Sequence, residues 1–401
     1  QTVFILMLIS RIDPVIDAGV FTIAFAIGNL MMAIGKYGIR QFQVSDVEEK
    51  YSFKEYTVAR IITSIIMIAA SFVCVGVNLA SGLYNSSKSI VIILICLAKV
   101  IDAVEDVIHG MFQQYLRLDV AGKILSIRMC TYIFVYLVCY YFSKNLILTS
   151  AVALLVSFIQ FVILNYTAIR GFEIKKKTFE IKNVKNIFVE CFPLFIASYL
   201  VIYIGNAPKY AIDKVMSSEA QACFTYIFMP VFVISLLSQF VYQPVISKMA
   251  LLWHEKKISQ FNKLILRQIA LILLLSVAAI IGGYLLGIPV LSLIYGVDLT
   301  DYKKALVILL IGGGALAIVN FLQMIITVAR NQKLLNIGYL LAFLLFVFGG
   351  KTITEKHGMI GISVFYTAVV MILGAVFIVL TIGIIKGYAN SDGKTVEEKK
   401  Q

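Results

Sequence analysis

Residues 88–114 read KSIVIILICLAKVIDAVEDVIHGMFQQ, an apolar run that carries several ionisable residues in its second half. A run of this length can cross a bilayer, because about 20 mostly apolar residues suffice for a transmembrane helix. The whole chain is similarly apolar: 60% of its 401 residues are hydrophobic and only 14% are charged, whereas soluble domains average about 25% charged residues. This composition excludes a soluble enzyme, a disordered chain and a nucleic-acid-binding module. It predicts an all-α polytopic membrane protein.

The apolar runs predict about 12 transmembrane helices, joined by loops too short to hold a soluble domain. The run at 1–11 has half the length of a span, so we expect it to be the second half of a truncated first helix. The other eleven spans are expected at 17–39, 57–80, 88–114, 122–143, 145–169, 189–214, 220–246, 264–288, 303–327, 334–350 and 357–385.

The formal net charge of +13 comes from 35 Lys and Arg against 22 Asp and Glu. When these basic residues are assigned to alternating loops, 25 of the 35 fall on one side, eight on the other and two inside spans. Short cytoplasmic loops carry an excess of Lys and Arg. The richer side is therefore predicted to be cytoplasmic, and both the N- and C-termini are expected there.

Two pairs of short segments indicate an internal repeat. VFTIAF at 20–25 is similar to CFTYIF at 223–228, and MFQQ at 111–114 is similar to NFLQ at 320–323. Parallel repeats of this kind occur in transporters, with the substrate site between the repeats near mid-membrane. We therefore expect two six-helix lobes at 1–170 and 188–386, a basic cytoplasmic linker at 171–187 and a cytoplasmic tail at 387–401.

The fourth span places Lys99, Asp102, Asp106 and His109 on one helical face, and Glu105 borders that face. A charge at the bilayer centre costs about 2.5–3.5 kcal/mol even on the most lenient scale. These groups must therefore face a hydrated pathway, where the carboxylates can bind a proton or a cation, or neutralise one another. In the second case Lys99 would pair with the two aspartates and lock this helix to a neighbour.

The seventh span contains GNAPKYAIDK at 205–214. Pro208 cannot donate a backbone hydrogen bond, so the helix is expected to kink or break there and, together with Pro193, to be discontinuous. Lys209 and Asp213 are four residues apart and can pair. Freed carbonyls and Lys209 would then bind substrate, or the segment is a kink with a local salt bridge.

Basic residues on the predicted cytoplasmic half form a third group of candidates, Lys36, Arg40 and Arg60. The planar guanidinium of Arg suits phosphate because it gives bidentate hydrogen bonds. Most such residues are interfacial anchors, and Arg60 is the exception expected inside a span. The six Cys show no metal-ligand spacing with one another or with His, so neither a metal site nor a cofactor is predicted.

Two motifs resemble bacterial polysaccharide flippases of the Wzx type. They are GKYGIRQFQVSD at 35–46, with YSF at 51–53 and Arg60 following, and NAPKYAID at 206–213. These flippases belong to the multidrug/oligosaccharidyl-lipid/polysaccharide exporter (MOP) superfamily, whose members have two six-helix lobes. The resemblance covers essentially the whole chain.

The resemblance implies an alternating-access flippase of the bacterial cytoplasmic (inner) membrane, not an enzyme. It would move undecaprenyl-diphosphate-linked oligosaccharide from the inner to the outer leaflet for O-antigen lipopolysaccharide or another surface polysaccharide. Coupling to H+ or Na+ and a polysaccharide polymerase as partner are also implied. The implied diphosphate contacts are Arg40, Arg60 and Lys209, and the implied cavity and ion-coupling residues are Lys99, Asp102, Glu105, Asp106, His109 and Asp213.

Two other functions stay open beside the flippase. A drug or cation antiporter on the same fold would use the acidic residues of the fourth span to bind a positively charged substrate. A membrane enzyme such as a polysaccharide polymerase or ligase would need a large external catalytic loop. The external loops are short and lack a nucleophile–base pair, which disfavours the enzyme.

Overall fold

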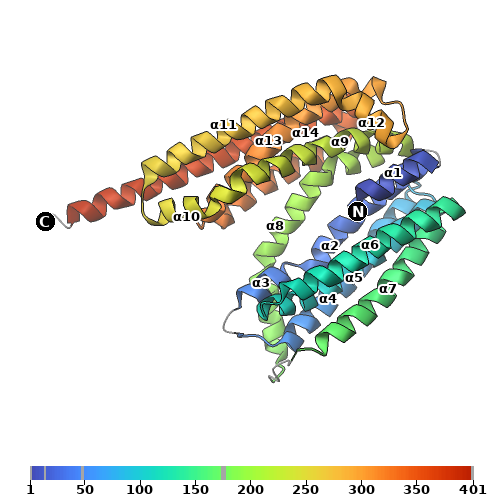
Figure 1. Ribbon diagram of the computed structural model, residues 1–401, viewed down its shortest axis with the longest axis horizontal. Coiled ribbons are helices and arrows are strands. Elements are labelled where there is room, and N and C mark those ends of the chain that lie inside the picture. Colours follow the sequence, from blue (N-terminus) through green and yellow to red (C-terminus); the bar gives the residue numbers. More distant parts are fainter. Residues whose placement is uncertain (1, 13–14, 47–48, 173–177, 399–401) are drawn as a thin grey trace. The chain divides into compact units, whose positions relative to one another are not determined.

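The structure is a computed structural model that describes residues 2–12, 15–46, 49–172 and 178–398. Across these ranges the regular secondary structure is helical (Figure 1). The chain divides into two compact units, the first formed by Gln1–Lys209 with Ser217–Ala222 and the second by Tyr210–Met216 with Cys223–Gln401. This division does not test the predicted boundaries of the two lobes and the linker, which stay a prediction.

The helices of the first unit begin with a short apolar helix and end with the longest helix of that unit. They are α1 (Thr2–Ile12), α2 (Val15–Lys36), α3 (Ile39–Ser45), α4 (Phe53–Ala80), α5 (Ser86–Gln114), α6 (Leu118–Ser143), α7 (Leu146–Ile169) and α8 (Ile181–Asp213), whose last residues enter the second unit. The remaining α-helices are α9 (Ser218–Tyr242), α10 (Ile246–His254), α11 (Ile258–Gly282), α12 (Ile288–Tyr295), α13 (Lys303–Val328) and α14 (Leu335–Glu398).

Among the described residues, nine helical stretches are long and apolar enough to cross a membrane. Nine of the twelve predicted spans correspond to these stretches, and the other three correspond to α5, α1 and the second half of α14. The helix α5 has 29 residues but carries too many charged residues to be counted among the nine. The helix α1 has only 11 residues, and α14 is counted once although it contains two predicted spans. The prediction of a multi-pass, all-helical membrane protein is confirmed.

The helix α14 reverses direction at a single residue. Gly358 has φ 56° and ψ −146°, a non-helical conformation within an otherwise helical stretch. The ring of Tyr339 lies 5.3 Å from that of Phe377, and the ring of Phe346 lies 5.4 Å from that of Phe365, so the two halves run antiparallel. The loop expected at 351–356 is instead helical, and the hairpin turn is confined to Gly358.

The helix α8 corrects two expectations. It begins at Ile181, eight residues before the predicted span, and it continues through Pro193 and Pro208 without a break. The prediction of a discontinuous helix is therefore wrong. Proline is tolerated within transmembrane helices because neighbouring groups and small local adjustments satisfy the freed carbonyl. Three lysines of the predicted linker, Lys175, Lys176 and Lys177, lie outside the described residues.

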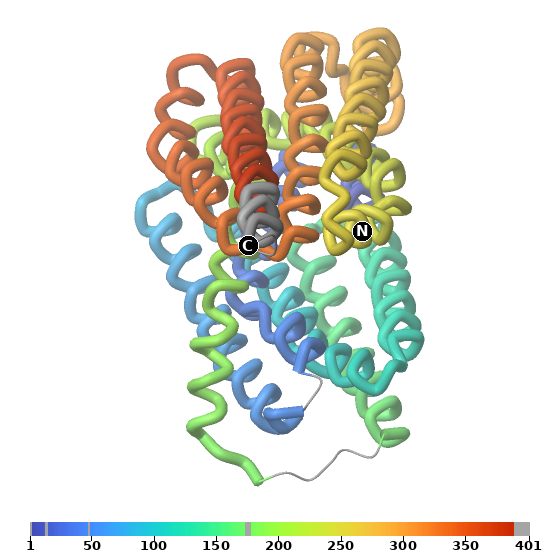
Figure 2. The backbone as a smooth tube through the Cα atoms, turned by 90° about the vertical axis from the view of Figure 1, so that its left-hand side faces the viewer, coloured from blue at the N-terminus to red at the C-terminus, as the bar shows by residue number. Residues whose placement is uncertain are grey.

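The helix α5 lies at the centre of the first unit, where α2, α4, α6 and α7 pack around it (Figures 1 and 2). Small residues permit this close packing. A Cβ at Gly28 would lie 3.2 Å from the Lys99 side chain, and one at Gly35 would lie 2.9 Å from Ala103. The helix α5 is thus covered by protein on several sides, which keeps its ionisable side chains away from lipid.

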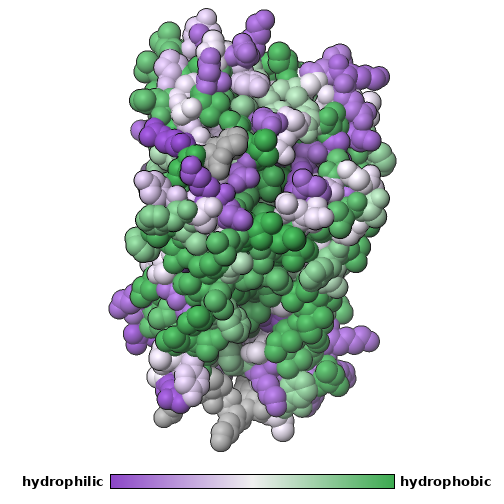
Figure 3. Space-filling view, turned by 90° about the vertical axis from the view of Figure 1, so that its right-hand side faces the viewer, coloured by the Kyte–Doolittle hydropathy of each residue, from purple (hydrophilic) through white to green (hydrophobic). Residues whose placement is uncertain are grey.

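The outer surface is rich in large exposed hydrophobic side chains, and Figure 3 shows them covering much of one face. Examples in the first unit are Phe134 on α6 and Phe158 on α7, each more than half exposed. Soluble monomers rarely expose contiguous apolar patches of more than a few hundred Å². These exposed apolar side chains are typical of a surface that contacts lipid.

One carboxylate joins the starts of α4 and α8. Glu55 forms a capping box with Ser52 at the N-terminus of α4. The second oxygen of Glu55 accepts hydrogen bonds from the backbone N–H of Glu180 at 3.0 Å and from Asn183 at 2.8 Å. Because unsatisfied N–H groups at helix N-termini need acceptors, Glu55 stabilises both helix ends and holds the first turns of α8 against α4.

The chain makes a tight left-handed turn between α2 and α3. Gly38 has φ 70° and lies against α8, where an added Cβ would come within 2.7 Å of the Leu194 Cβ. Only glycine adopts this backbone conformation at low cost and also leaves room for the neighbouring helix.

We predict that Gly38→Ala lowers the apparent thermal unfolding midpoint of the detergent-purified protein by several degrees. The left-handed backbone strain costs about 1–3 kcal/mol, and the clash with α8 adds to it. The matched control is Gly76→Ala on α4, where an added Cβ meets nothing within 4 Å. An unchanged midpoint for Gly38→Ala would show that this turn does not constrain the packing of α8.

Candidate functional site

Three cations surround one carboxylate in the first unit. Asp106 on α5 lies 3.8 Å from Lys36 Nζ, 3.5 Å from Arg40 Nη1 and 2.9 Å from Arg60 Nη2. The cations come from the end of α2, from α3 and from α4 respectively. We call Lys36, Arg40, Arg60 and Asp106 the cationic cluster; with ordinary ionisation its net charge is +2.

The members of the cationic cluster differ in exposure. The side chain of Arg60 is 0% exposed, whereas those of Arg40 and Lys36 are 29% and 39% exposed. Arg60 also donates to the carbonyl of Gly35 at 2.6 Å, at the C-terminal end of α2. Arg40 donates a further hydrogen bond to Gln113 Oε1 at 3.1 Å. Arg60 thus fixes the end of α2 and the Asp106 carboxylate, while Arg40 and Lys36 present donors at the surface.

A second charged group lies beside α5 on the N-terminal side of Asp106, and we call it the paired cluster. It consists of Lys99, Asp102 and Glu105 of α5 and Arg128 of α6. Lys99 Nζ lies 3.0 Å from Asp102, and Arg128 Nη2 lies 2.5 Å from the other oxygen of Asp102. Arg128 also contacts Glu105 at 2.7 Å. Two cations and two carboxylates balance, so the paired cluster has no net charge.

Polar neighbours complete the paired cluster. Asn165 on α7 donates to Glu105 Oε1 at 2.9 Å, and His109 Nε2 lies 4.0 Å from the same oxygen. Lys99 Nζ also lies 4.3 Å from the centre of the Phe25 ring, a cation–π contact. Glu105, His109 and Arg128 are all more than nine-tenths buried. Breaking one of these buried pairs would leave an uncompensated charge inside the protein.

The charged residues predicted to share one face of α5 contact helices on two different sides of it. Asp102 and Glu105 contact Arg128 of α6, whereas Asp106 contacts α2, α3 and α4. Lys99 pairs with Asp102, and Asp106 takes its counter-ions from elsewhere. In this conformation all three carboxylates are ion-paired.

Arg128 was not predicted as a site residue, because it was counted among the 25 basic residues of the predicted cytoplasmic side. The residue is only 4% exposed and lies on α6. A signal was present, because Arg128 lies six residues inside the span predicted at 122–143. Asn165 was also missed, and it has no sequence signal that separates it from ordinary membrane-helix residues, whereas Lys36 was among the basic candidates named from the sequence.

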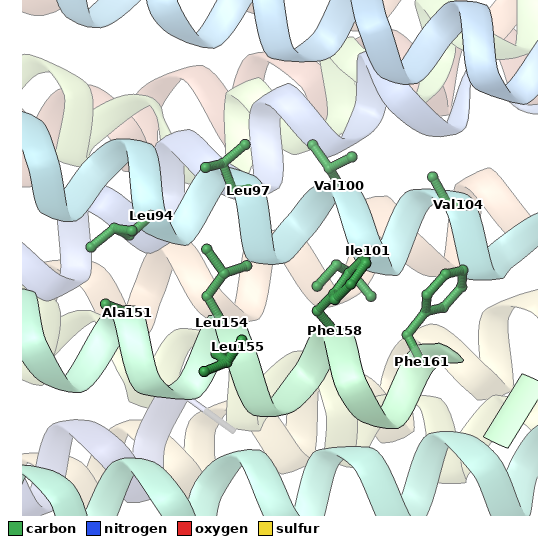
Figure 4. A pocket seen from close by; sticks show the side chains of 10 residues that line it. All are labelled: Leu94, Leu97, Val100, Ile101, Val104, Ala151, Leu154, Leu155, Phe158 and Phe161. Carbon is green, nitrogen blue, oxygen red and sulfur yellow. The ribbon is translucent and has the colours of Figure 1, made fainter. Parts of the chain in front are cut away.

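The opposite face of α5 is apolar. A cavity of about 450 Å³ lies between α5 and α7 (Figure 4). The figure shows its side chains projecting from these two helices, and none of them is polar. The lining residues are Leu94, Leu97, Val100, Ile101, Val104, Ala151, Leu154, Leu155, Phe158 and Phe161. Charge and apolar surface are thus separated onto opposite sides of the same helix.

Lys209 and Asp213 lie near the C-terminal end of α8, and both are buried. Gly38 contacts α8 at Leu194, 15 residues before Lys209. At 1.5 Å per residue, Lys209 is therefore about 22 Å along the helix from the level of the cationic cluster. The structure does not bring Lys209 together with Arg40 and Arg60.

The second unit has a different interior. Apart from Asp213, its buried polar residues are uncharged wherever side chains are described. Several donate to backbone carbonyls of their own helix, as Ser238 and Ser276 do. Others bond side chains, as in Asn320 with Ser235 at 2.6 Å and Tyr339 with Gln323 at 2.7 Å. The ion-paired clusters described here therefore belong to the first unit.

Comparison with known proteins shows which fold this is. The structure superimposes on an inward-facing multidrug resistance MATE family transporter of the MOP superfamily with a TM-score of 0.72 and 12% identity, covering 97% of this chain and 94% of the other. It superimposes on the lipid II flippase MurJ in an inward closed conformation with a TM-score of 0.73 and 13% identity, covering 96% and 87%. The fold is that of the MOP superfamily transporters, which confirms the predicted two-lobe, internally repeated class.

One curated protein is similar in sequence, the capsular polysaccharide biosynthesis protein CapF of Staphylococcus aureus. It is 23% identical over 310 residues, which are 77% of this chain and 76% of CapF. No protein-family model matches the chain. The solved structures named above are transporters and flippases, not enzymes.

We predict that Arg128→Leu strongly reduces the amount of folded protein. The change leaves Lys99 as the counter-ion of Asp102 and removes the cation that pairs with Glu105. Breaking a buried ion pair costs about 3–5 kcal/mol. The loss should appear as a lower yield of monodisperse protein in size-exclusion chromatography and a lower unfolding midpoint.

The rescue and the control make this test specific. The double variant Arg128→Leu/Glu105→Gln removes one charge of each sign and should recover most of the yield. Arg117→Leu is the matched control, because Arg117 is exposed and pairs with the exposed Asp119. Equal yields for Arg128→Leu and Arg117→Leu would contradict a structural role for the paired cluster.

Proposed function

We propose that this protein is an alternating-access flippase for undecaprenyl-diphosphate-linked oligosaccharide, which it moves from the inner to the outer leaflet for cell-surface polysaccharide synthesis. We place it in the bacterial cytoplasmic membrane with both termini inside and with a polysaccharide polymerase as a partner. The similarity to CapF and the fold shared with MurJ support this class of cargo.

The cationic cluster carries the proposal. Three cations share one carboxylate, so the cluster has positive charge to spare for an anionic ligand. Charge-assisted hydrogen bonds from Arg and Lys to phosphate are among the strongest in proteins. The exposed donors are on Arg40 and Lys36, and we propose that they bind the diphosphate.

Arg60 and Lys209 take different roles in the proposal. The buried side chain of Arg60 already bonds Gly35 and Asp106, so it positions the cluster and contacts cargo only if Asp106 moves away. Lys209 lies about 22 Å along α8 from the cluster, farther than one diphosphate reaches. We propose that Arg40 and Lys209 contact the diphosphate at successive stages of transport. Asp213, four residues after Lys209 on α8, would be the partner of Lys209 when no cargo is bound.

The paired cluster is the proposed place of ion coupling. Asp102 and Glu105 are neutralised by Lys99 and Arg128 in this conformation. Binding of H+ or Na+ by these carboxylates would therefore require the two cations to move away. Coupling through this cluster thus depends on a conformational change around α5 and α6, and His109 borders the group that would exchange the ion.

A drug or cation antiporter is the second candidate, because MATE transporters share the fold. The electrostatics of the first unit argue against it. A cationic drug needs free negative charge, whereas Asp102, Glu105 and Asp106 are all ion-paired and the cationic cluster is positive. Active efflux of ethidium from a sensitised bacterial strain that expresses the protein would favour the antiporter.

We predict that Arg40→Ala and Lys36→Ala each weaken the binding of undecaprenyl diphosphate by about tenfold, because each removes one charged hydrogen bond. Lys209→Ala is expected to weaken binding less in the conformation described here. The measurement is equilibrium binding of the lipid to purified protein in nanodiscs.

The control variant is Lys123→Ala, an exposed lysine on α6 that lies outside the cluster. It should bind the lipid as the wild-type protein does. If Arg40→Ala and Lys36→Ala also bind with wild-type affinity while folding normally, the cationic cluster does not bind diphosphate and the assignment is wrong.

A further inference from the structure

A row of aromatic side chains follows one face of α8 between the cationic cluster and Lys209. It consists of Phe192, Phe195, Tyr199 and Tyr203, which are spaced by three, four and four residues and therefore share a helical face. The ring of Phe195 lies 6.3 Å from that of Phe192 and 5.9 Å from that of Tyr199. We call these four residues the aromatic row; it spans about 16 Å of the helix.

One end of the aromatic row is fixed beside the proposed diphosphate site. Tyr37 stacks on Phe195 with the ring centres 4.6 Å apart and the planes 13° apart. Tyr37 directly follows Lys36 and precedes Arg40 by three residues, so the same turn of chain carries the two exposed cations and the stacking partner. The row therefore continues the cationic cluster along α8.

The tyrosines of the row are partly exposed near the middle of the helix. The helix α8 has 33 residues centred on position 197, so Tyr199 lies about 3 Å and Tyr203 about 9 Å from its midpoint. The hydrocarbon core extends about 15 Å to each side of the bilayer centre. Tyrosines that face lipid gather at the membrane interfaces, where the phenol reaches water. Partly exposed phenols at mid-helix thus point to a water-filled space.

The chemistry of these rings matches a sugar. One face of a pyranose ring presents C–H groups, which pack on the negatively polarised face of an aromatic ring, while the phenol hydroxyl can hydrogen-bond a sugar hydroxyl. A row of rings that adjoins a phosphate-binding site suits a chain of sugars attached to a diphosphate. Stacking also tolerates differences between sugars, because it does not read individual hydroxyl groups.

We infer that the aromatic row on α8 is a saccharide subsite, in which Tyr199 and Tyr203 stack on the sugar rings of the cargo while Arg40 and Lys36 bind its diphosphate. This inference rests on the proposed flippase function and adds to it. The row accounts for recognition of the saccharide, which the cationic cluster alone does not provide.

Two lipid probes test the inference on purified protein in nanodiscs. One is undecaprenyl diphosphate, and the other is undecaprenyl diphosphate that carries a disaccharide of N-acetylglucosamine. The variant Tyr199→Leu/Tyr203→Leu should bind the saccharide-bearing lipid about tenfold more weakly than the wild type, because two ring contacts are lost. It should bind undecaprenyl diphosphate without change.

Control variants separate stacking from general effects on folding or lipid contact. Tyr199→Phe/Tyr203→Phe keeps both rings and should lose at most about threefold, since only hydrogen bonds of the hydroxyls are removed. Phe134→Leu removes a lipid-exposed ring of α6 and should leave both affinities unchanged. If the double leucine variant does not fold, the single variants Tyr199→Leu and Tyr203→Leu should each show about a threefold selective loss.

The outcomes distinguish this inference from the function on which it rests. Equal affinity of the wild type and the leucine variants for the saccharide-bearing lipid would overturn the subsite, as would an equal loss for both lipids. Wild-type protein that binds neither lipid would overturn the proposed flippase function and the subsite with it.

Discussion

The arrangement of the first unit depends on how the charges of α5 are neutralised inside a membrane. Asp102, Glu105 and Asp106 each need a counter-ion, because a lone charge in the hydrocarbon region is costly. Lys99 lies on α5 itself, and the other cations come from four other helices. Arg60 and Arg128 each join a carboxylate of α5 to a different helix. The pairs fix the helices around α5 and leave a positive excess only at the cluster around Asp106.

This distribution of charge links the fold to the proposed function. The paired cluster is neutral and buried, so it holds α5, α6 and α7 together. The cationic cluster is positive and partly exposed, so it can bind an anion without losing its structural contacts through Arg60. A single helix thus contributes to both the stability of the unit and the candidate binding site, and its opposite face lines an apolar cavity.

Much of the fold follows from the sequence, because the number and length of apolar runs determine how many helices can cross a membrane. Arg40, Arg60 and Asp106 were also recognisable as candidates, since charged residues within or beside apolar spans are rare. Their partners were not, because helical periodicity shows which residues share a face but not which helix lies opposite. Arg128 was therefore placed in a loop, and the alternative in which the fourth span neutralises itself paired Lys99 with both aspartates, whereas Asp106 pairs with Lys36, Arg40 and Arg60. The prolines of α8 misled the prediction, because a membrane helix tolerates the loss of a backbone hydrogen bond.

The most direct test of the central claim is transport by the purified protein in liposomes. Fluorescent undecaprenyl-diphosphate-linked oligosaccharide would be placed in both leaflets, and chemical quenching from outside would report how much becomes accessible over time. The account predicts rapid movement of this lipid between leaflets and no protein-dependent uptake of ethidium by the same liposomes. Ethidium transport without movement of the lipid-linked saccharide would contradict it.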